Sequence, residues 1–250
     1  ELQNEFRKRI REGYYRLVIC TPPCNSWTRV VWRNARGPCP CRARQWPMGF
    51  PWAVGKTHAR AELGTILVQL LIDIMDDITS ADLVELVTLL GEHPKDLGFG
   101  PGFQPASIWQ LEELRRAAGS RFLSSAFYQC QLCGAEDLPS KDYPKPTRTI
   151  SNSKRIAELG VLDWPILSED GEYLGPLPRQ CGHSHKQSLV RDEADADFRT
   201  KDTSSYPALM DQKLAQALVE DIRSSVAVSP LDGKQRPPTS MKLYEAHALQ

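Results

Sequence analysis

A Pro-Pro-Cys sequence directly after a short apolar run is the first place where this chain could carry out chemistry. The run is Leu17 to Cys20, and Pro22-Pro23-Cys24 follows it. Two consecutive prolines cannot continue a central strand, because neither has a backbone N–H to donate. We therefore expect a buried strand over residues 16–21 and a stiff turn that carries Cys24 past its carboxyl end. Ligands bind at that edge of open α/β sheets, and a thiol there is a candidate nucleophile. The alternative is a small buried cysteine after a turn.

A second apolar run, residues 83–90, ends in Gly91-Glu92-His93-Pro94. Its last half predicts a second buried strand, with a helix as the alternative, and Glu92 lies at the carboxyl end of that strand. Residues 58–78 separate the two strands and have the apolar spacing of a helix buried on most sides, as a crossover helix would be. If the strands are parallel neighbours, Cys24 and Glu92 lie at the same edge of the sheet.

The remaining segments give weaker patterns around these two strands. Ser107 and Gln110 have the spacing of a capping box at the start of a helix. The expected elements are helices over 1–15, 107–118 and 207–222, strands over 127–132 and 146–150, and a loop-rich wrap over 160–205. Arg148 would lie on the last of these strands or, in a purely structural interpretation, on the surface.

The composition is that of an ordinary globular protein with an uneven distribution of charge. The chain has 250 residues and zero net charge, but residues 1–60 hold twelve Lys or Arg against three Asp or Glu. A basic region of this kind suggests a polyanionic partner. Seven scattered cysteines argue against a disulfide scaffold and for a reducing, intracellular compartment. No signal-peptide or membrane-spanning pattern is present in these residues.

The segment 25–57 combines aromatic and basic residues and has no regular periodicity. Arginine interleaved with tryptophan suits a nucleic-acid strand, since guanidinium groups pair with phosphates and rings stack on bases. The alternative is that the aromatic side chains pack the loop onto the core. The candidate nucleic-acid-binding residues are Trp27, Arg29, Arg33, Arg36, Arg42 and Arg44.

The order of these motifs resembles a divergent branch of the cytosine-5 DNA methyltransferases. That family has a Pro-Cys nucleophile motif after its fourth strand, a glutamate motif after its fifth and an arginine-bearing strand later. Longer stretches resemble proteins that occur in many copies in protist genomes, including dinoflagellates, some of them linked to mobile elements. These stretches are Gly37-Pro38, Gly49-Phe50-Pro51-Trp52, Pro105-Ala106-Ser107-Ile108-Trp109 and Tyr173-Leu174-Gly175-Pro176-Leu177-Pro178.

The resemblance implies a reaction and a role for three residues. Cys24 would add to carbon 6 of cytosine, Glu92 would act as the acid at ring nitrogen 3, and Arg148 would hold the base or stabilise the adduct. Carbon 5 would then accept a methyl group from S-adenosylmethionine, and the base would have to leave the duplex. DNA and a nuclear location are implied in the same way.

The resemblance also implies a domain organisation. Residues 1–158 would form the C-terminal part of a methyltransferase-like, partial Rossmann-like α/β domain. Residues 159–224 would be a loop-rich extension with a terminal helix, and 225–250 a disordered tail. Three features of the family are not found. His93-Pro94 stands where Asn-Val is expected after the glutamate, the Gln-x-Arg-x-Arg pattern is not present around Arg148, and the glycine-rich loop that binds S-adenosylmethionine is missing. The sequence therefore predicts a fragment that is incomplete or inactive alone and binds the donor weakly or not at all.

Two further hypotheses remain open. An adenine amino-methyltransferase also uses a Pro-Pro motif at a strand end, although an aromatic residue normally stands where Cys24 does. A non-enzymatic, zinc-stabilised nucleic-acid-binding module is the other. Its potential ligands are Cys130, Cys133, Cys181 and either His183 or His185. A strand over 127–132 would place Cys130 and Cys133 on opposite faces, so no metal site is expected there.

Overall fold

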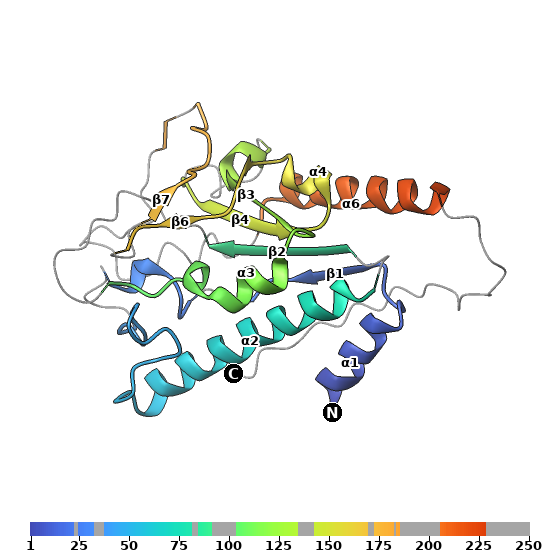
Figure 1. The fold of residues 1–250 in the computed structure, drawn as a ribbon. Coiled ribbons are helices and arrows are strands. Elements are labelled where there is room, and N and C mark those ends of the chain that lie inside the picture. Colours follow the sequence, from blue (N-terminus) through green and yellow to red (C-terminus); the bar gives the residue numbers. More distant parts are fainter. Residues whose placement is uncertain are drawn as a thin grey trace.

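A computed structural model shows a mixed α/β protein (Figure 1). The structure describes residues 1–22, 25–32, 38–81, 85–91, 104–134, 143–169, 173–182, 184–185 and 206–228. Among these residues no helix is long and apolar enough to cross a membrane.

Five strands form the main sheet in the order β1-β2-β4-β3-β5. They are β1 (Leu17–Cys20), β2 (Glu85–Gly91), β3 (Leu123–Tyr128), β4 (Pro146–Ser151) and β5 (Val161–Leu162). The β1 and β2 strands pair in parallel, whereas β4 is antiparallel to both β2 and β3. The strands expected over 16–21, over the last half of 83–90 and over 146–150 are found, and the parallel pairing of the first two is confirmed. The β2 strand begins earlier than expected, at Glu85, and β1 is an edge strand with Ile19 60% exposed where a buried strand was expected. A small second sheet joins β6 (Ile166–Leu167) to β7 (Tyr173–Gly175).

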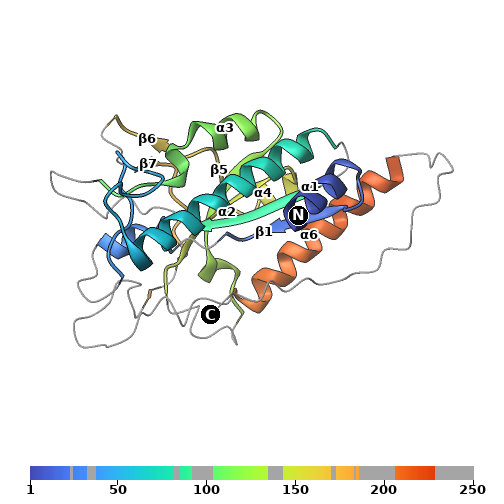
Figure 2. The same cartoon turned by 90° about the horizontal axis from the view of Figure 1, so that it is seen from below.

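Helices cover both faces of the main sheet (Figures 1 and 2). On one face α1 (Leu2–Arg11), α2 (Gly55–Thr79) and α3 (Glu112–Ala118) enclose the larger core, into which Val18, Leu86 and Ile150 project. On the other face α4 (Lys154–Ala157) and α6 (Ala208–Val228) pack over Phe127 and Leu17. Because Leu17 and Val18 are consecutive strand residues, they point to opposite faces, as the period of two requires.

The α2 helix is the crossover between the two parallel strands. It runs for 25 residues and buries nine of them, among them Leu71, Ile74 and Met75. The sequence predicted burial on most sides, yet Leu63 and Ile66 are about half exposed. The first half of α2 contacts the segment 25–57, because Trp27 donates to the Gly64 carbonyl and Arg42 donates to the Ala61 carbonyl.

The 3-10 helix η2 (Ile108–Gln110) precedes α3, and together they replace the single helix predicted over 107–118. The capping box is confirmed: the Ser107 hydroxyl accepts from the Trp109 N–H, and the Gln110 side chain accepts from the Ser107 N–H. The Leu111 residue between η2 and α3 has extended backbone angles, which separate the two short helices.

Two boundaries differ from the sequence prediction. The strand expected over 127–132 lies earlier, as β3, and is followed by the 3-10 helix η3 (Gln129–Leu132). The first half of β3 has no apolar run that would predict a strand, because Ser124 and Ser125 are polar, although both are buried. The predicted tail from 225 is wrong for 225–228, which continue α6; residues 229–250 lie outside the described part.

Candidate functional site

The carboxyl ends of β1 and β2 form the edge where the sequence predicts catalysis. In the parallel register Cys20 is opposite Thr88. Cys24 follows Cys20 by four residues, and Glu92 follows Thr88 by four residues. Both residues, together with Pro23, His93 and Pro94, lie outside the described residues. The structure thus describes the two strands that lead into the predicted site, and not the site's reactive groups.

The thiol nearest this edge in the described part belongs to Cys20. Burial raises the pKa of the Cys20 thiol to about 12. A thiol with this pKa is almost entirely protonated at neutral pH, so Cys20 is a poor nucleophile. It cannot stand in for Cys24 in the proposed chemistry.

Arg148 is fully buried at the centre of β4. Its guanidinium donates to the Ser124 hydroxyl (3.1 Å), the Tyr173 hydroxyl (2.8 Å) and the carbonyl oxygens of Asp163 and Pro176. The alternative of a surface arginine is therefore wrong. These contacts hold the β7 segment against the sheet, which gives Arg148 a structural role in this structure; its contact with a base stays a prediction.

Trp27 and Arg42 require a correction. They were candidates for nucleic-acid binding, yet Trp27 is 4% exposed and Arg42 is 2% exposed. The Trp27 indole donates to the Gly64 carbonyl (3.2 Å), and the Arg42 guanidinium lies over the Trp27 ring. Both side chains fasten the segment 25–57 to α2, so in this structure they do not face a ligand.

The two terminal nitrogens of Arg42 are satisfied by acceptors inside the protein, whereas its buried Nε has no hydrogen-bond partner among the described residues. Its two terminal nitrogens donate to the carbonyl oxygens of Pro47 (2.6 Å) and Ala61 and to the Ser26 hydroxyl (3.2 Å). Burial lowers the pKa of Arg42, with smaller opposing effects from the neighbouring Cys41. An arginine side chain remains protonated even so. The buried guanidinium of Arg42 therefore holds the Ser26 and Pro47 parts of the segment 25–57 against Ala61 of α2.

The other predicted nucleic-acid-binding residues are divided between described and undescribed positions. Arg44 is half-buried, and its backbone pairs with Gln104 and Gln110. Arg29 begins the 3-10 helix η1 (Arg29–Trp32), but its side chain is outside the described part. Arg33 and Arg36 are outside it altogether.

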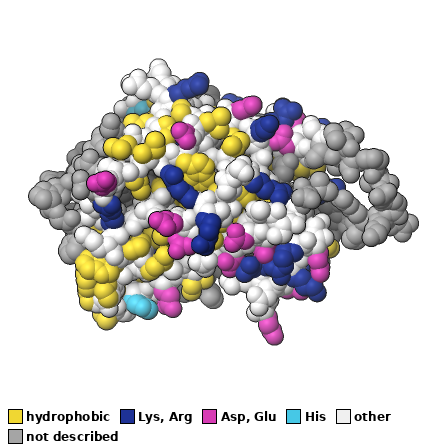
Figure 3. Space-filling model, in the orientation of Figure 1, with side chains coloured by type: hydrophobic (Ala, Val, Ile, Leu, Met, Phe, Trp, Pro, Cys, Tyr) yellow, Lys and Arg dark blue, Asp and Glu magenta, His cyan; other side chains and the backbone are white. Residues whose placement is uncertain are grey.

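An aromatic cluster at the end of the same segment is partly exposed. Phe50 and Trp52 stack with ring centres 4.9 Å apart and planes at 10°. Trp46 meets the Trp52 ring edge-on at 4.8 Å. Trp52 is 57% exposed, and Val54 and Met48 beside it in the sequence are also exposed. Figure 3 shows hydrophobic side chains gathered at the lower left, over the start of α2. The prediction of an aromatic ligand surface thus fits Trp52 and its neighbours better than Trp27.

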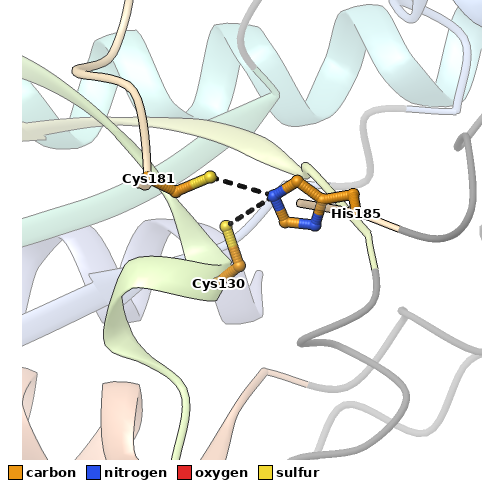
Figure 4. A group of neighbouring side chains, drawn as sticks. All are labelled: Cys130, Cys181 and His185. Carbon is orange, nitrogen blue, oxygen red and sulfur yellow. Dashed lines mark hydrogen bonds between the residues drawn. The ribbon is translucent and has the colours of Figure 1, made fainter. Parts of the chain in front are cut away.

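A second candidate centre lies where η3 meets the segment after β7. Cys130, Cys181 and His185 bring their ligand atoms within 4.8 Å of one another (Figure 4). The sequence argument against a metal assumed that Cys130 and Cys133 share a strand. That assumption is wrong, because Cys130 lies in η3 and Cys133 follows its end. His183 lies outside the described residues. Burial, followed by the neighbouring Cys181, raises the pKa of Cys130 to about 12.

The contacts that hold this centre were not foreseen from the sequence. The Gln131 side-chain amide donates to the backbone carbonyls of Arg179 and Gln180. Nothing in the local pattern marks Gln131 or Tyr173 as partners of residues that lie far away in the chain. The available signals were the C-x-x-C spacing of Cys130 and Cys133 and the closeness of Cys181 to two histidines, and the sequence left the choice between His183 and His185 open.

No protein-family model, curated protein or solved structure matches this chain. The arrangement of its own residues therefore carries the functional argument.

Proposed function

We propose that the chain is a DNA cytosine-5 methyltransferase-like protein whose reactive groups are Cys24 and Glu92. The parallel pairing of β1 with β2 supports this proposal most directly. Cys24 and Glu92 follow the paired residues Cys20 and Thr88 by the same number of positions. Neighbouring strands are about 4.8 Å apart. Two chain segments that leave adjacent parallel strands at equal distance can bring their side chains to one substrate.

The topology around this pair is consistent with the finer fold assignment. A long crossover helix, α2, joins the parallel strands, and the next strand in the sheet, β4, is antiparallel. Doubly wound sheets often carry an antiparallel strand beside parallel ones. We therefore infer a partial Rossmann-like sheet, with the segments after β1 and β2 at the ligand-binding edge.

The chemistry assigned to the two residues can be stated as one reversible addition. The Cys24 thiolate forms a bond to carbon 6 of a cytosine while Glu92 donates a proton to ring nitrogen 3. The electron pair of the carbon 5–carbon 6 double bond is then available at carbon 5. Carbon 5 can accept a proton from water and then lose one of its two hydrogens as a proton to water. Reversal of the addition breaks the bond to the Cys24 sulfur, returns the proton of ring nitrogen 3 to Glu92 and releases the base. The base must first leave the duplex.

The methyl donor of the family has no recognisable site among the described residues. A donor site would need a strand followed by a glycine-rich loop. The described chain ahead of β1 is the helix α1 and a turn at Gly13. The residues described here do not fit S-adenosylmethionine, and the proposal routes no step through it.

The exchange of the hydrogen at carbon 5 tests the proposal without a methyl donor. The protein is incubated in heavy water with an oligonucleotide that contains cytosine, and deuterium incorporation is measured by mass spectrometry. We expect incorporation with the wild-type chain and with Cys39→Ser, whose thiol is exposed and distant in sequence. Cys24→Ser should abolish it, and Glu92→Gln should reduce it strongly. Absence of exchange in every protein would contradict the proposal.

A specific observation favours a nucleic-acid-binding module as the second candidate. The exposed Trp52 ring, stacked on Phe50, offers a platform for an unpaired base. Stacking of one base contributes about 1–3 kcal/mol. We expect Trp52→Ala to weaken binding of single-stranded DNA about tenfold or more in fluorescence anisotropy. Leu63→Ala, an equally exposed residue on α2, is the control. Binding that depends on Trp52 without carbon-5 exchange would favour the module over the enzyme.

A further inference from the structure

Two thiols converge on one imidazole nitrogen where η3 meets the segment after β7. The Cys181 sulfur is 3.0 Å from His185 Nε2, and the Cys130 sulfur is 3.6 Å from the same atom (Figure 4). A neutral imidazole nitrogen that accepts has one lone pair. Two S–H groups cannot both be well satisfied by it, whereas one metal ion between the three atoms would bind all of them.

We propose that Cys130, Cys181 and His185 bind one zinc ion. Thiolate and imidazole ligands together are typical of zinc. With bond lengths of about 2.3 Å to sulfur and 2.0 Å to nitrogen, tetrahedral coordination separates sulfur from nitrogen by about 3.5 Å. The Cys130–His185 distance matches this value, and the Cys181–His185 distance is about half an ångström shorter. Small side-chain rotations would complete the geometry.

Contacts that need no metal bring the three ligands together. The Gln131 amide holds the carbonyls of Arg179 and Gln180, directly before Cys181. Earlier in the segment, Arg148 donates to the Tyr173 hydroxyl and the Pro176 carbonyl. The chain before Cys181 is thus anchored at two points, to β4 through Arg148 and to η3 through Gln131. A site positioned in this way loses little chain entropy when it binds an ion.

Cys133 is a candidate for the fourth ligand. It follows Cys130 by three residues, the C-x-x-C spacing of many zinc sites. In the structure its thiol donates to the Gln129 carbonyl at 3.3 Å, so it would have to rotate toward the ion. A water molecule is the alternative occupant of this position, as in open zinc sites.

A zinc ion here would have a structural consequence. Cys130 lies beside the core that η3 shares with α6, where Leu132 packs with Met210 and Leu214. Cys181 and His185 lie on the chain after β7. The ion would therefore link that chain to the sheet and to α6. This inference does not depend on the proposed methyltransferase chemistry.

Metal analysis of the full chain tests the proposal. The protein is purified without chelator from medium that contains zinc, and metal per chain is measured by inductively coupled plasma mass spectrometry. We expect about one zinc per chain in the wild type and in Cys39→Ser, a control at an exposed cysteine outside the cluster. Cys130→Ser, Cys181→Ser and His185→Ala should each lose most of the zinc.

Cobalt substitution covers the case in which the variants fold poorly. The wild-type chain, stripped of metal with chelator, is titrated with Co²⁺ and its visible spectrum is recorded. We expect saturable d–d bands of tetrahedral thiolate-bound cobalt, displaced by zinc, and a lower thermal midpoint after chelation. Wild-type protein that holds no zinc and gives no such bands would overturn the proposal. So would a Cys130–Cys181 disulfide found by mass spectrometry in protein purified under reducing conditions.

Discussion

The Arg42 guanidinium carbon lies 3.7 Å from the centre of the Trp27 ring, and both side chains are almost fully buried. Both residues belong to the segment 25–57, and both contact α2. The Trp27 indole donates to the Gly64 carbonyl, and the Arg42 guanidinium donates to the Ala61 carbonyl. The basic, tryptophan-rich segment is thus anchored through an internal cation–π contact. Its exposed part, around Trp52, is what remains for a ligand.

Replacement of Arg42 by methionine should destabilise the fold. The variant keeps an apolar chain of similar length but leaves the carbonyls of Pro47 and Ala61 and the Ser26 hydroxyl without their donor. At about 1 kcal/mol for each lost bond, the free energy of unfolding should fall by about 2–4 kcal/mol. Urea denaturation measures it. Arg44→Met, at a half-buried arginine two positions away, should change it by about 0.5 kcal/mol or less. Equal losses in both variants would contradict the anchoring role.

Gly64 is the position on α2 where the loop approaches most closely. A Cβ there would lie 2.1 Å from the Ser26 hydroxyl oxygen and 3.0 Å from an Arg42 nitrogen. Alanine is the better helix former by about 1 kcal/mol. We nevertheless expect Gly64→Ala to be destabilising by about 1–3 kcal/mol, since overpacking displaces the Ser26 loop. Thermal unfolding, with Leu63→Ala as a nearby exposed control, measures the difference. A raised unfolding temperature would show that the loop yields without cost.

The contact between α1 and α2 predicts an acid-sensitive stability. Asp77 accepts from Arg7 at 2.6 Å and from Arg11 at 2.8 Å, and its side chain is 7% exposed. Burial alone would raise the pKa of Asp77, but the hydrogen bonds and charges of Arg7 and Arg11 outweigh it and hold the pKa below its ordinary value of 3.8. The unfolded chain therefore binds a proton more readily than the folded one. This stabilisation is present above about pH 4 and is lost as the pH falls through the depressed pKa of the folded state.

Asp77→Asn tests this linkage. At pH 7 the variant should unfold at lower urea concentration than the wild type, and the gap should shrink as the pH falls below about 4. Asp76→Asn, an exposed neighbour on the same helix, should behave as the wild type does at each pH. A gap between wild type and Asp77→Asn that stays constant with pH would exclude the linkage.

The sequence predicted the elements whose local pattern and tertiary role agree. The run from Leu17 to Cys20, stopped by prolines, gave β1, and the apolar period of α2 gave the crossover helix. The beginning of β3 was missed because its buried serines are satisfied only across the sheet, as where Ser125 pairs with Thr149 at 2.9 Å. A rule based on apolar runs has no means of seeing that bond.

The candidate sites divide in the same way. An arginine among tryptophans has the same local sequence pattern whether it faces a phosphate or a ring inside the protein. The structure shows that Arg42 is of the second kind, because it stacks on Trp27 and donates to Ala61 on α2. Cys130 and His185 are separated by 55 residues, and their meeting depends on Gln131 and Arg148. Long-range contacts of this kind are set by the fold, so the sequence could name the ligand types without pairing them.

Cys20 and Cys39 should differ sharply in reactivity. Burial raises the pKa of Cys20 from 9.0 to about 12, so at pH 8 it carries about a thousandfold less thiolate than an ordinary cysteine. Cys39 is exposed. With iodoacetamide and peptide mapping by mass spectrometry, we expect Cys39 to be alkylated within minutes and Cys20 only after unfolding in urea. Alkylation of Cys20 at the rate of Cys39 would show that the end of β1 opens in solution.

Variants of Arg148 can distinguish a structural role of this residue from a catalytic one. Its guanidinium joins β4 to Tyr173, Pro176 and Asp163, so Arg148→Met should lower the free energy of unfolding by on the order of 3 kcal/mol. Arg148→Lys keeps the charge but not the fork of donors, and should recover only part of the loss. Tyr173→Phe removes the hydroxyl that accepts from Arg148 and donates to the Pro176 carbonyl, and should cost about 1–2 kcal/mol.

Limited proteolysis completes the Arg148 test. Loss of the arginine should expose the chain after β7 to cleavage well below the urea concentration that unfolds the protein, since Arg148 holds Pro176 and Tyr173 to the sheet. Cleavage sites read by mass spectrometry should fall between residues 163 and 185. If Arg148 instead acts mainly on a base, Arg148→Lys would abolish carbon-5 exchange while stability and cleavage stay as in the wild type. The buried network around the guanidinium leads us to expect the reverse: a loss of stability first, and a loss of exchange only in proportion to it.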